Sequence, residues 1–186
     1  MKTVLRGSVL TVGNNIDTDM IVPGRYLELT DPKEIGRHCL AGISEDIGPN
    51  FPQGGIVVAG TNFGCGSSRE HAAWAIAGYG FQAVISSSFA DIHKQNELNN
   101  FIVPVAVSEA FLAELFRRIE KDPATEVAIN LPDATVEICG TAHKERFSIS
   151  RFKQYCLANA LDDIDFLLEN QKKTETWEMK NQEFAQ

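Results

Sequence analysis

One stretch of the sequence combines residue types that bind anions with glycines that let a ligand approach the backbone. It contains Gly64-Cys65-Gly66-Ser67-Ser68-Arg69-Glu70-His71, between a short apolar run and a helical pattern. Ligands bind at such strand-to-helix junctions in open α/β sheets. The free amides and positive dipole end of the helix, together with the guanidinium of Arg69, favour a carboxylate or a phosphate. The sequence therefore predicts an anion site here, although it has neither dinucleotide-binding nor P-loop glycine spacing.

Plainer roles are open for the same residues. Ser67 and Glu70 have the spacing of a capping box, so Ser67 could simply cap the helix. Cys65 would be a nucleophile if the helix N-terminus lowered its thiol pKa, but the sequence identifies no base beside it. His71 lies one turn into the helix, where a surface or packing role is sufficient.

Two further segments place polar side chains beside predicted strands. The segment Asn15-Ile16-Asp17-Thr18-Asp19 could ligate a hard cation through its carboxylates, or form Asx turns. The segment Ser86-Ser87-Ser88-Phe89-Ala90-Asp91-Ile92-His93 lies at a second strand-to-helix junction, where capping is the simpler role. The histidines outside the glycine-rich stretch have no metal-site spacing and are interpreted as ordinary: His38, His93 and His143.

The elements that must position these segments alternate along the chain. Apolar runs predict strands over residues 4–11, 55–60, 81–86 and 102–107, and helical patterns cover 31–40, 69–77, 89–99 and 108–121. This alternation favours an α/β fold with a mainly parallel central sheet. Short strands over 125–129, 136–139 and 146–149 predict an antiparallel C-terminal part, followed by a helix from Ser150 to about Leu161.

Composition excludes several classes of protein. The 186 residues include 17 basic and 25 acidic side chains, a net charge of −8, which disfavours binding to nucleic acid or an anionic membrane. The apolar runs are too short to span a bilayer, and the charged N-terminus resembles no secretory signal, so we expect a cytoplasmic protein. The four cysteines form no CxxC pair, so we expect free thiols and no metal site in this chain.

Taken together and in this order, the three polar segments resemble the swivelling domain of the aconitase superfamily. The block Gly66-Ser67-Ser68-Arg69-Glu70-His71-Ala72 is the most specific part, and the likeness is to the free-standing small subunits of isopropylmalate dehydratases. It implies a swivelling β/β/α domain over residues 1–165, and leaves residues 166–186 as a loosely docked or disordered tail.

The resemblance also implies a mechanism. A [4Fe-4S] cluster with an open iron site acts as a Lewis acid, Ser67 is the base, Ser68 and Arg69 hold a substrate carboxylate, and Asp19 is an active-site aspartate. A serine base needs a strongly positive site. This chain lacks three suitably spaced cysteines. The resemblance implies that a large partner subunit carries the cluster and that this chain is half of a heterodimeric enzyme.

The implied reaction interconverts 2-isopropylmalate and 3-isopropylmalate by dehydration and rehydration, in leucine biosynthesis. Leu27 is expected to face the variable substrate group, because homoaconitase-like relatives carry an arginine there and a leucine suits an apolar group. Small subunits of homoaconitase or of methylmalate or dimethylmalate dehydratases remain alternatives. A stand-alone carboxylate-binding domain is the alternative from another class.

Overall fold

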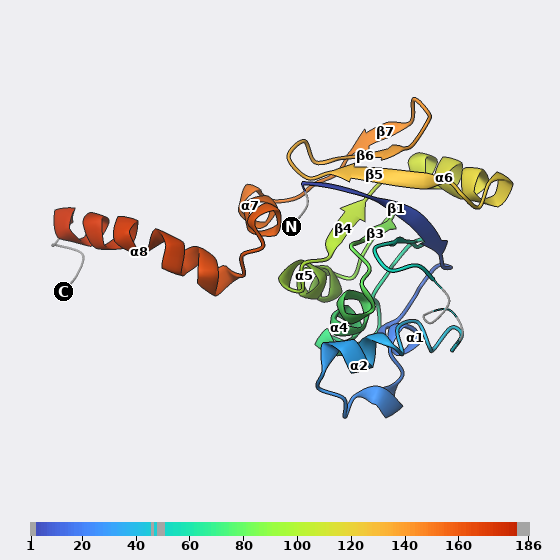
Figure 1. The fold of residues 1–186 in the computed structure, drawn as a ribbon, viewed down its shortest axis with the longest axis horizontal. Coiled ribbons are helices and arrows are strands. Elements are labelled where there is room, and N and C mark those ends of the chain that lie inside the picture. The colour runs from blue at the N-terminus through green and yellow to red at the C-terminus, as the bar shows by residue number, and fades with distance from the viewer. Residues whose placement is uncertain (1–2, 46, 48–50, 182–186) are drawn as a thin grey trace.

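A seven-stranded sheet of order β4-β3-β2-β1-β5-β6-β7 forms the centre of the computed structural model, which describes residues 3–45, 47 and 51–181 (Figure 1). The strands are β1 (Val4–Thr11), β2 (Ile56–Val58), β3 (Ala83–Ser86), β4 (Val103–Ala106), β5 (Glu126–Asn130), β6 (Thr135–Ile138) and β7 (Lys144–Arg146). Strand β1 joins two halves, because its end pairs parallel with β2 and its start pairs antiparallel with β5. The predicted α/β fold with parallel core strands and an antiparallel C-terminal part is confirmed.

Helices cover both faces of this sheet. The helices with described bounds are α1 (Thr18–Ile21), the 3-10 helix η1 (Gly24–Tyr26), α2 (Pro32–Gly36), α4 (Glu70–Tyr79), α5 (Asp91–Asn99), α6 (Glu109–Lys121), α7 (Arg151–Asn159) and α8 (Asp163–Lys180). Successive side chains of a strand point to opposite faces of the sheet. On one face, Ile56 and Val58 pack with α6 in a first core cluster. On the other face, Val57 packs with α1, α2 and α4 in a second core cluster. Both faces of the parallel strands are therefore buried, as their continuous apolar runs predict.

Some predicted boundaries differ from the structure. Asp31 caps α2 as expected, accepting from the N–H of Lys33 at 2.9 Å, but the helix ends at Gly36 and turns follow to residue 43. The last antiparallel strand, β7, ends at Arg146, where the predicted strand began. Ser150 caps α7 as predicted, through the N–H of Lys153.

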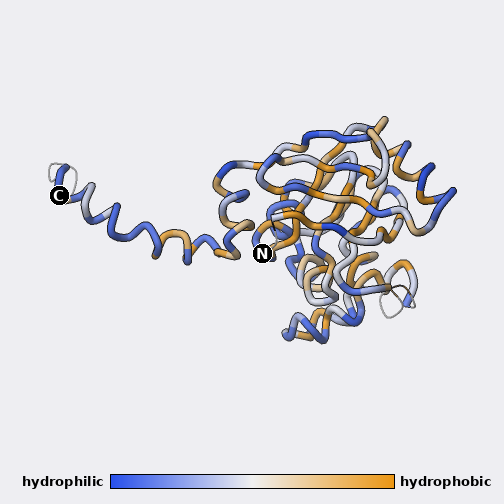
Figure 2. Tube along the Cα trace, turned by 45° about the horizontal axis from the view of Figure 1, so that its top comes forward, coloured by the Kyte–Doolittle hydropathy of each residue, from blue (hydrophilic) through white to orange (hydrophobic). Residues whose placement is uncertain are grey.

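Helix α8 follows α7, although the sequence pattern predicted no helix beyond Leu161. A capping box of Asp162 and Asp165 starts α8, and the helix projects away from the sheet and its covering helices (Figures 1 and 2). None of its residues is buried, and Ile164 and Leu167 are each 67% exposed. The division between a domain over 1–165 and a tail stays a prediction. None of the helices in the described ranges is both long and apolar enough to cross a bilayer.

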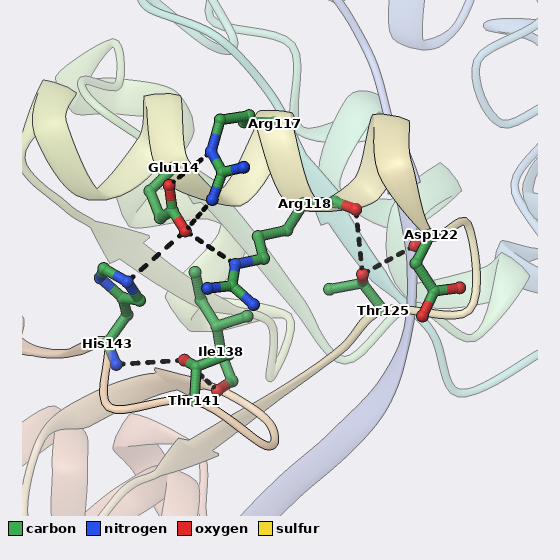
Figure 3. Close-up of polar contacts among 8 residues, drawn as sticks. All are labelled: Glu114, Arg117, Arg118, Asp122, Thr125, Ile138, Thr141 and His143. Carbon is green, nitrogen blue, oxygen red and sulfur yellow. Dashed lines mark hydrogen bonds and ion pairs between the residues drawn. The ribbon is translucent and has the colours of Figure 1, made fainter.

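The antiparallel strands are fastened to α6 by a charged cluster around Glu114 (Figure 3). The Glu114 carboxylate accepts hydrogen bonds from Arg117 and from Arg118, each at 2.7 Å, and lies 3.5 Å from Nε2 of His143, just before β7. Hydrogen bonds from Arg117 and Arg118 lower the pKa of Glu114 to about 2. This cluster connects α6 to the loop between β6 and β7.

Candidate active site

Three loops meet at the carboxyl ends of the parallel strands, and they are the three polar segments of the sequence. The N–H of Gly64 donates to the carbonyl of Ile16 at 2.8 Å, and the N–H of Thr18 donates to the carbonyl of Cys65 at 3.0 Å. The N–H of Phe63 donates to the carbonyl of Ser88 at 3.0 Å. The loops after β1, β2 and β3 therefore form one backbone framework at the sheet edge where open α/β sheets bind ligands.

Polar side chains reinforce this framework. The amide of Asn62 donates to Oδ1 of Asn15 at 3.0 Å, and both residues have a positive φ, of 59° and 53°. Ser88 Oγ accepts from the N–H of Asn62 at 2.9 Å and lies 2.8 Å from the hydroxyl of Thr61. Ser88 thus links the loop after β3 to the loop after β2. The helix-capping role predicted for its segment is wrong, because the N-cap residue of α5 is Ala90 and no side chain caps this helix.

Ser67 and Ser68 are exposed and directly precede the N-terminus of α4. Arg69 occupies the N-cap position, and no side chain caps the helix, so the capping interpretation of Ser67 is wrong. Among the described residues, the Ser67 hydroxyl has no hydrogen-bond partner. The carbonyl of Ser68 accepts from the amide of Asn96 at 3.5 Å, which ties the loop to α5. Within the described ranges, neither serine hydroxyl makes a hydrogen bond, and both residues directly precede the start of α4.

Arg69 and Asp19 form an ion pair next to these serines, although the two residues are far apart in the sequence. Nη1 of Arg69 donates to Oδ1 of Asp19, and this hydrogen bond lowers the pKa of the Asp19 carboxyl and raises the pKa of the Arg69 guanidinium. The Arg69 side chain is 27% exposed and that of Asp19 is 57% exposed. Arg69 therefore keeps its charge and remains partly accessible to solvent.

Asp17 has a structural role in the same segment. It is the N-cap of α1 and accepts from the N–H of Met20 at 2.8 Å, which confirms the Asx-type interpretation. Within residues 3–45, 47 and 51–181, there is no group of three or more histidine, cysteine or acidic side chains that could hold a metal ion.

Leu27 ends η1 and is half-buried against the second core cluster. Arg25 holds the loop around Leu27. Nη2 of Arg25 lies 2.7 Å from Oε1 of Glu45, and Cζ of Arg25 lies 4.7 Å from the ring centre of Tyr26. Glu28, the next residue, is exposed. The loop begins beside Asp19, since the backbone of Gly24 helps to lower the pKa of the Asp19 carboxyl. A contact between Leu27 and substrate stays a prediction.

The cysteines do not fit an iron–sulfur cluster. Cys39 and Cys156 are buried, and Cys65 and Cys139 are half-buried. Burial raises the pKa of Cys39, Cys139 and Cys156, which disfavours the thiolate form that ligates iron. In the described part of the chain, none of the four cysteines is in a group of three or more side chains that could hold a metal ion.

Sequence reasoning missed His93 and Glu97, a buried pair beneath the loop that carries Ser67. His93 is 1% exposed and Glu97 is 0% exposed, and Nε2 of His93 lies 3.2 Å from Oε1 of Glu97. Their spacing of four residues on a predicted helix was the available signal. Such pairs occur mostly on exposed helix faces, so the spacing alone did not indicate burial.

Comparison with known proteins gives consistent matches. The family model described as the aconitase C-terminal domain matches residues 50–110. The 3-isopropylmalate dehydratase small subunit of Azobacteroides pseudotrichonymphae is 43% identical over 175 residues, covering 88% of this chain and 89% of its own length. That of Cytophaga hutchinsonii is 44% identical over 174 residues, with coverage of 88% and 87%.

A solved structure also matches the fold. The crystal structure of a 3-isopropylmalate dehydratase from Methanocaldococcus jannaschii superposes with a TM-score of 0.76 at 31% sequence identity. The match covers 93% of this chain and 98% of the other.

Proposed function

Because the chain belongs to the family of 3-isopropylmalate dehydratase small subunits, we propose that it is one half of a hydro-lyase that interconverts 2-isopropylmalate and 3-isopropylmalate. The reaction is a dehydration followed by rehydration, and its place is leucine biosynthesis. The observation that carries the proposal is an accessible guanidinium, that of Arg69, beside the two free hydroxyls of Ser67 and Ser68.

Arg69 and Ser68 bind a carboxylate of the substrate. A guanidinium pairs with a carboxylate through two parallel N–H···O bonds, and the amides at the start of α4 add favourable dipoles. Asp19 accepts a hydrogen bond from Nη1 of Arg69, so the guanidinium is already placed beside a carboxylate group in this structure. Because its pKa is lowered, Asp19 stays ionised at neutral pH and keeps Arg69 oriented.

Ser67 is the base that removes a proton from the carbon next to a substrate carboxylate. Its hydroxyl has no partner among the described residues, so it can turn toward the substrate. A serine hydroxyl ionises far above neutral pH, and the start of α4 with the nearby Arg69 lowers the free energy of the charged form. The alkoxide of Ser67 takes the proton as the C–H bond breaks and becomes the neutral hydroxyl, and it returns the proton when the alkene is rehydrated.

The partner is a large subunit, and we assign the [4Fe-4S] cluster of the reaction to it. The printed name "small subunit" of the relatives supports a partner, and the cysteines of this chain do not fit the cluster. The cluster supplies a Lewis acid when bound, while this chain supplies the carboxylate site and the base. A cytoplasmic location stays a prediction of the sequence.

Co-expression with a large subunit of the family, followed by anaerobic cluster reconstitution, tests the proposal. A panel of isopropylmalate, methylmalate, dimethylmalate and homoaconitase substrates is then compared by specificity constant. We expect isopropylmalate to rank first, because we propose that Leu27 faces the variable group of the substrate and an apolar side chain suits an isopropyl group. A higher value for a tricarboxylate or for methylmalate would assign the chain to one of those enzymes. Binding of isopropylmalate by a chain that forms no complex would make it a stand-alone carboxylate-binding domain.

A further inference from the structure

His93 and Glu97 form a buried ionisable pair that the proposed reaction does not use. In the described ranges, no other histidine, acidic or basic side chain is buried. Nε2 of His93 lies 3.2 Å from Oε1 of Glu97, an ion-pair distance without hydrogen-bond geometry, and neither side chain has a hydrogen bond to any described residue. Replacing such a pair by apolar residues of similar volume is often neutral or stabilising. Stability therefore does not account for the pair.

The pair lies directly under the loop that presents Ser67. A Cβ built on Gly64 would come within 2.1 Å of Cδ2 of His93, so the imidazole fills the space where a side chain at 64 would lie. The φ of Gly64 is +74°, and the ring of Phe63 meets the ring of His93 edge-on at 5.4 Å. The backbone of the loop therefore rests on the imidazole, three residues before Ser67.

Glu97 is the residue that can fix the tilt of this ring. It lies one turn after His93 on α5, is fully buried, and touches the ring at Nε2. Burial raises the pKa of Glu97, and the contact with His93 acts against this shift. Among the described residues, Nδ1 of His93 has no partner, and Nε2 has the 3.2 Å ion-pair contact with Glu97 but no hydrogen bond. The carboxylate of Glu97 is therefore the charged group that faces the ring.

We propose that His93, held by Glu97, is a positioning residue that sets the conformation of the Gly64–Ser68 loop and thereby the place of the Ser67 hydroxyl. The inference rests on the proposed function for its catalytic consequence. Arg69 is positioned separately by Asp19. The pair should therefore affect the proton-transfer step, measured by kcat, more than substrate binding, measured by KM.

The test replaces the pair by apolar side chains of similar volume, in the variant His93→Phe/Glu97→Leu. We expect its melting temperature to be kept and its kcat in the reconstituted complex to fall about 10–100-fold, as for a small misplacement of reacting groups. KM should change less. In the isolated, isotope-labelled small subunit, the backbone amide resonances of Gly64 and Ser67 should shift.

Two further variants complete the experiment. Glu97→Gln keeps a polar group beside Nε2 and should restore kcat close to that of the unchanged complex. Leu98 lies on the same helix, α5, and packs against the first core cluster. Leu98→Ala should therefore lower the melting temperature without lowering kcat.

Unchanged turnover of the double variant, unchanged amide resonances, or an equal loss of kcat in Leu98→Ala would each overturn the proposal. Failure of the unchanged complex to turn over isopropylmalate would refute the proposed function instead. In that case, the amide resonances of Gly64 and Ser67 alone would show whether His93 and Glu97 determine the conformation of the Gly64–Ser68 loop.

Discussion

Replacing Ser67 by alanine separates a catalytic role from a structural one, because the structure leaves this hydroxyl without a capping bond. Arg69, not Ser67, is the N-cap of α4, and the Ser67 side chain is exposed. Ser67→Ala should therefore leave the free energy of unfolding nearly unchanged. The loss of a general base should lower kcat by about 10²–10⁴-fold, a barrier increase of about 3–5 kcal/mol.

Ser150 provides the matched control. It is exposed and caps α7 by accepting from the N–H of Lys153 at 3.2 Å. Ser150→Ala should cost about 1 kcal/mol and lower the melting temperature by about 2–4 °C. Its kcat in the complex should not change.

The assay combines thermal melting of the small subunit with turnover of isopropylmalate by the reconstituted complex. Opposite patterns are expected for the two serines: lost turnover at Ser67 and lost stability at Ser150. A Ser67→Ala protein that melts like Ser150→Ala and keeps its turnover would refute the reasoning, since Ser67 would then be structural.

Three further outcomes follow from the same contacts. Arg69→Lys keeps the positive charge but loses the planar guanidinium, which binds a carboxylate through two hydrogen bonds. KM for isopropylmalate should therefore rise about 10–100-fold, as expected for the loss of one charge-assisted hydrogen bond. An unchanged KM would mean that Arg69 binds no carboxylate. Leu27→Arg should lower the ratio of the specificity constants for isopropylmalate and a tricarboxylate by about 10-fold or more. The control Glu28→Arg changes an exposed neighbour and should change this ratio less. Equal changes in the two variants would mean that Leu27 does not contact the substrate. Glu114→Gln should destabilise the chain above pH 4.5 and lose this effect as the pH falls through about 2, because the pKa of Glu114 is lowered in the folded state. Urea midpoints of both proteins across pH measure the last effect, and a difference that persists at the acid end would contradict it.

The parallel core was predictable because its strands are short apolar runs bounded by glycines and separated by helical patterns. Ile56–Val58 illustrates this, since all three residues are buried. Helix α8 was missed because none of its side chains is buried and its apolar residues show no sustained period, although the capping box of Asp162 and Asp165 is visible in the sequence. The predicted bounds of short elements such as β7 were wrong by a few residues, because a strand of three residues shows little hydrophobic periodicity.

The residues of the site were predictable, but their contacts were not. Asp19 and Arg69 were each singled out from their own segment. Their pairing depends on the strand order, which sets β1 beside β2 and so brings the two loops together. The roles of His93 and Glu97 depend on which face of α5 turns inward, and the weak apolar pattern of that helix does not determine this. Distances between segments are thus what the sequence lacks.

The central claim is that this chain is half of an isopropylmalate-converting enzyme, and a titration tests it most directly. A fixed amount of cluster-loaded large subunit receives increasing amounts of this chain under anaerobic conditions, and isopropylmalate conversion is measured at each point. The account predicts no conversion by either protein alone and a rate that rises until the two are equimolar. Conversion by the large subunit alone, or a rate that this chain does not change while it binds the large subunit, would contradict it.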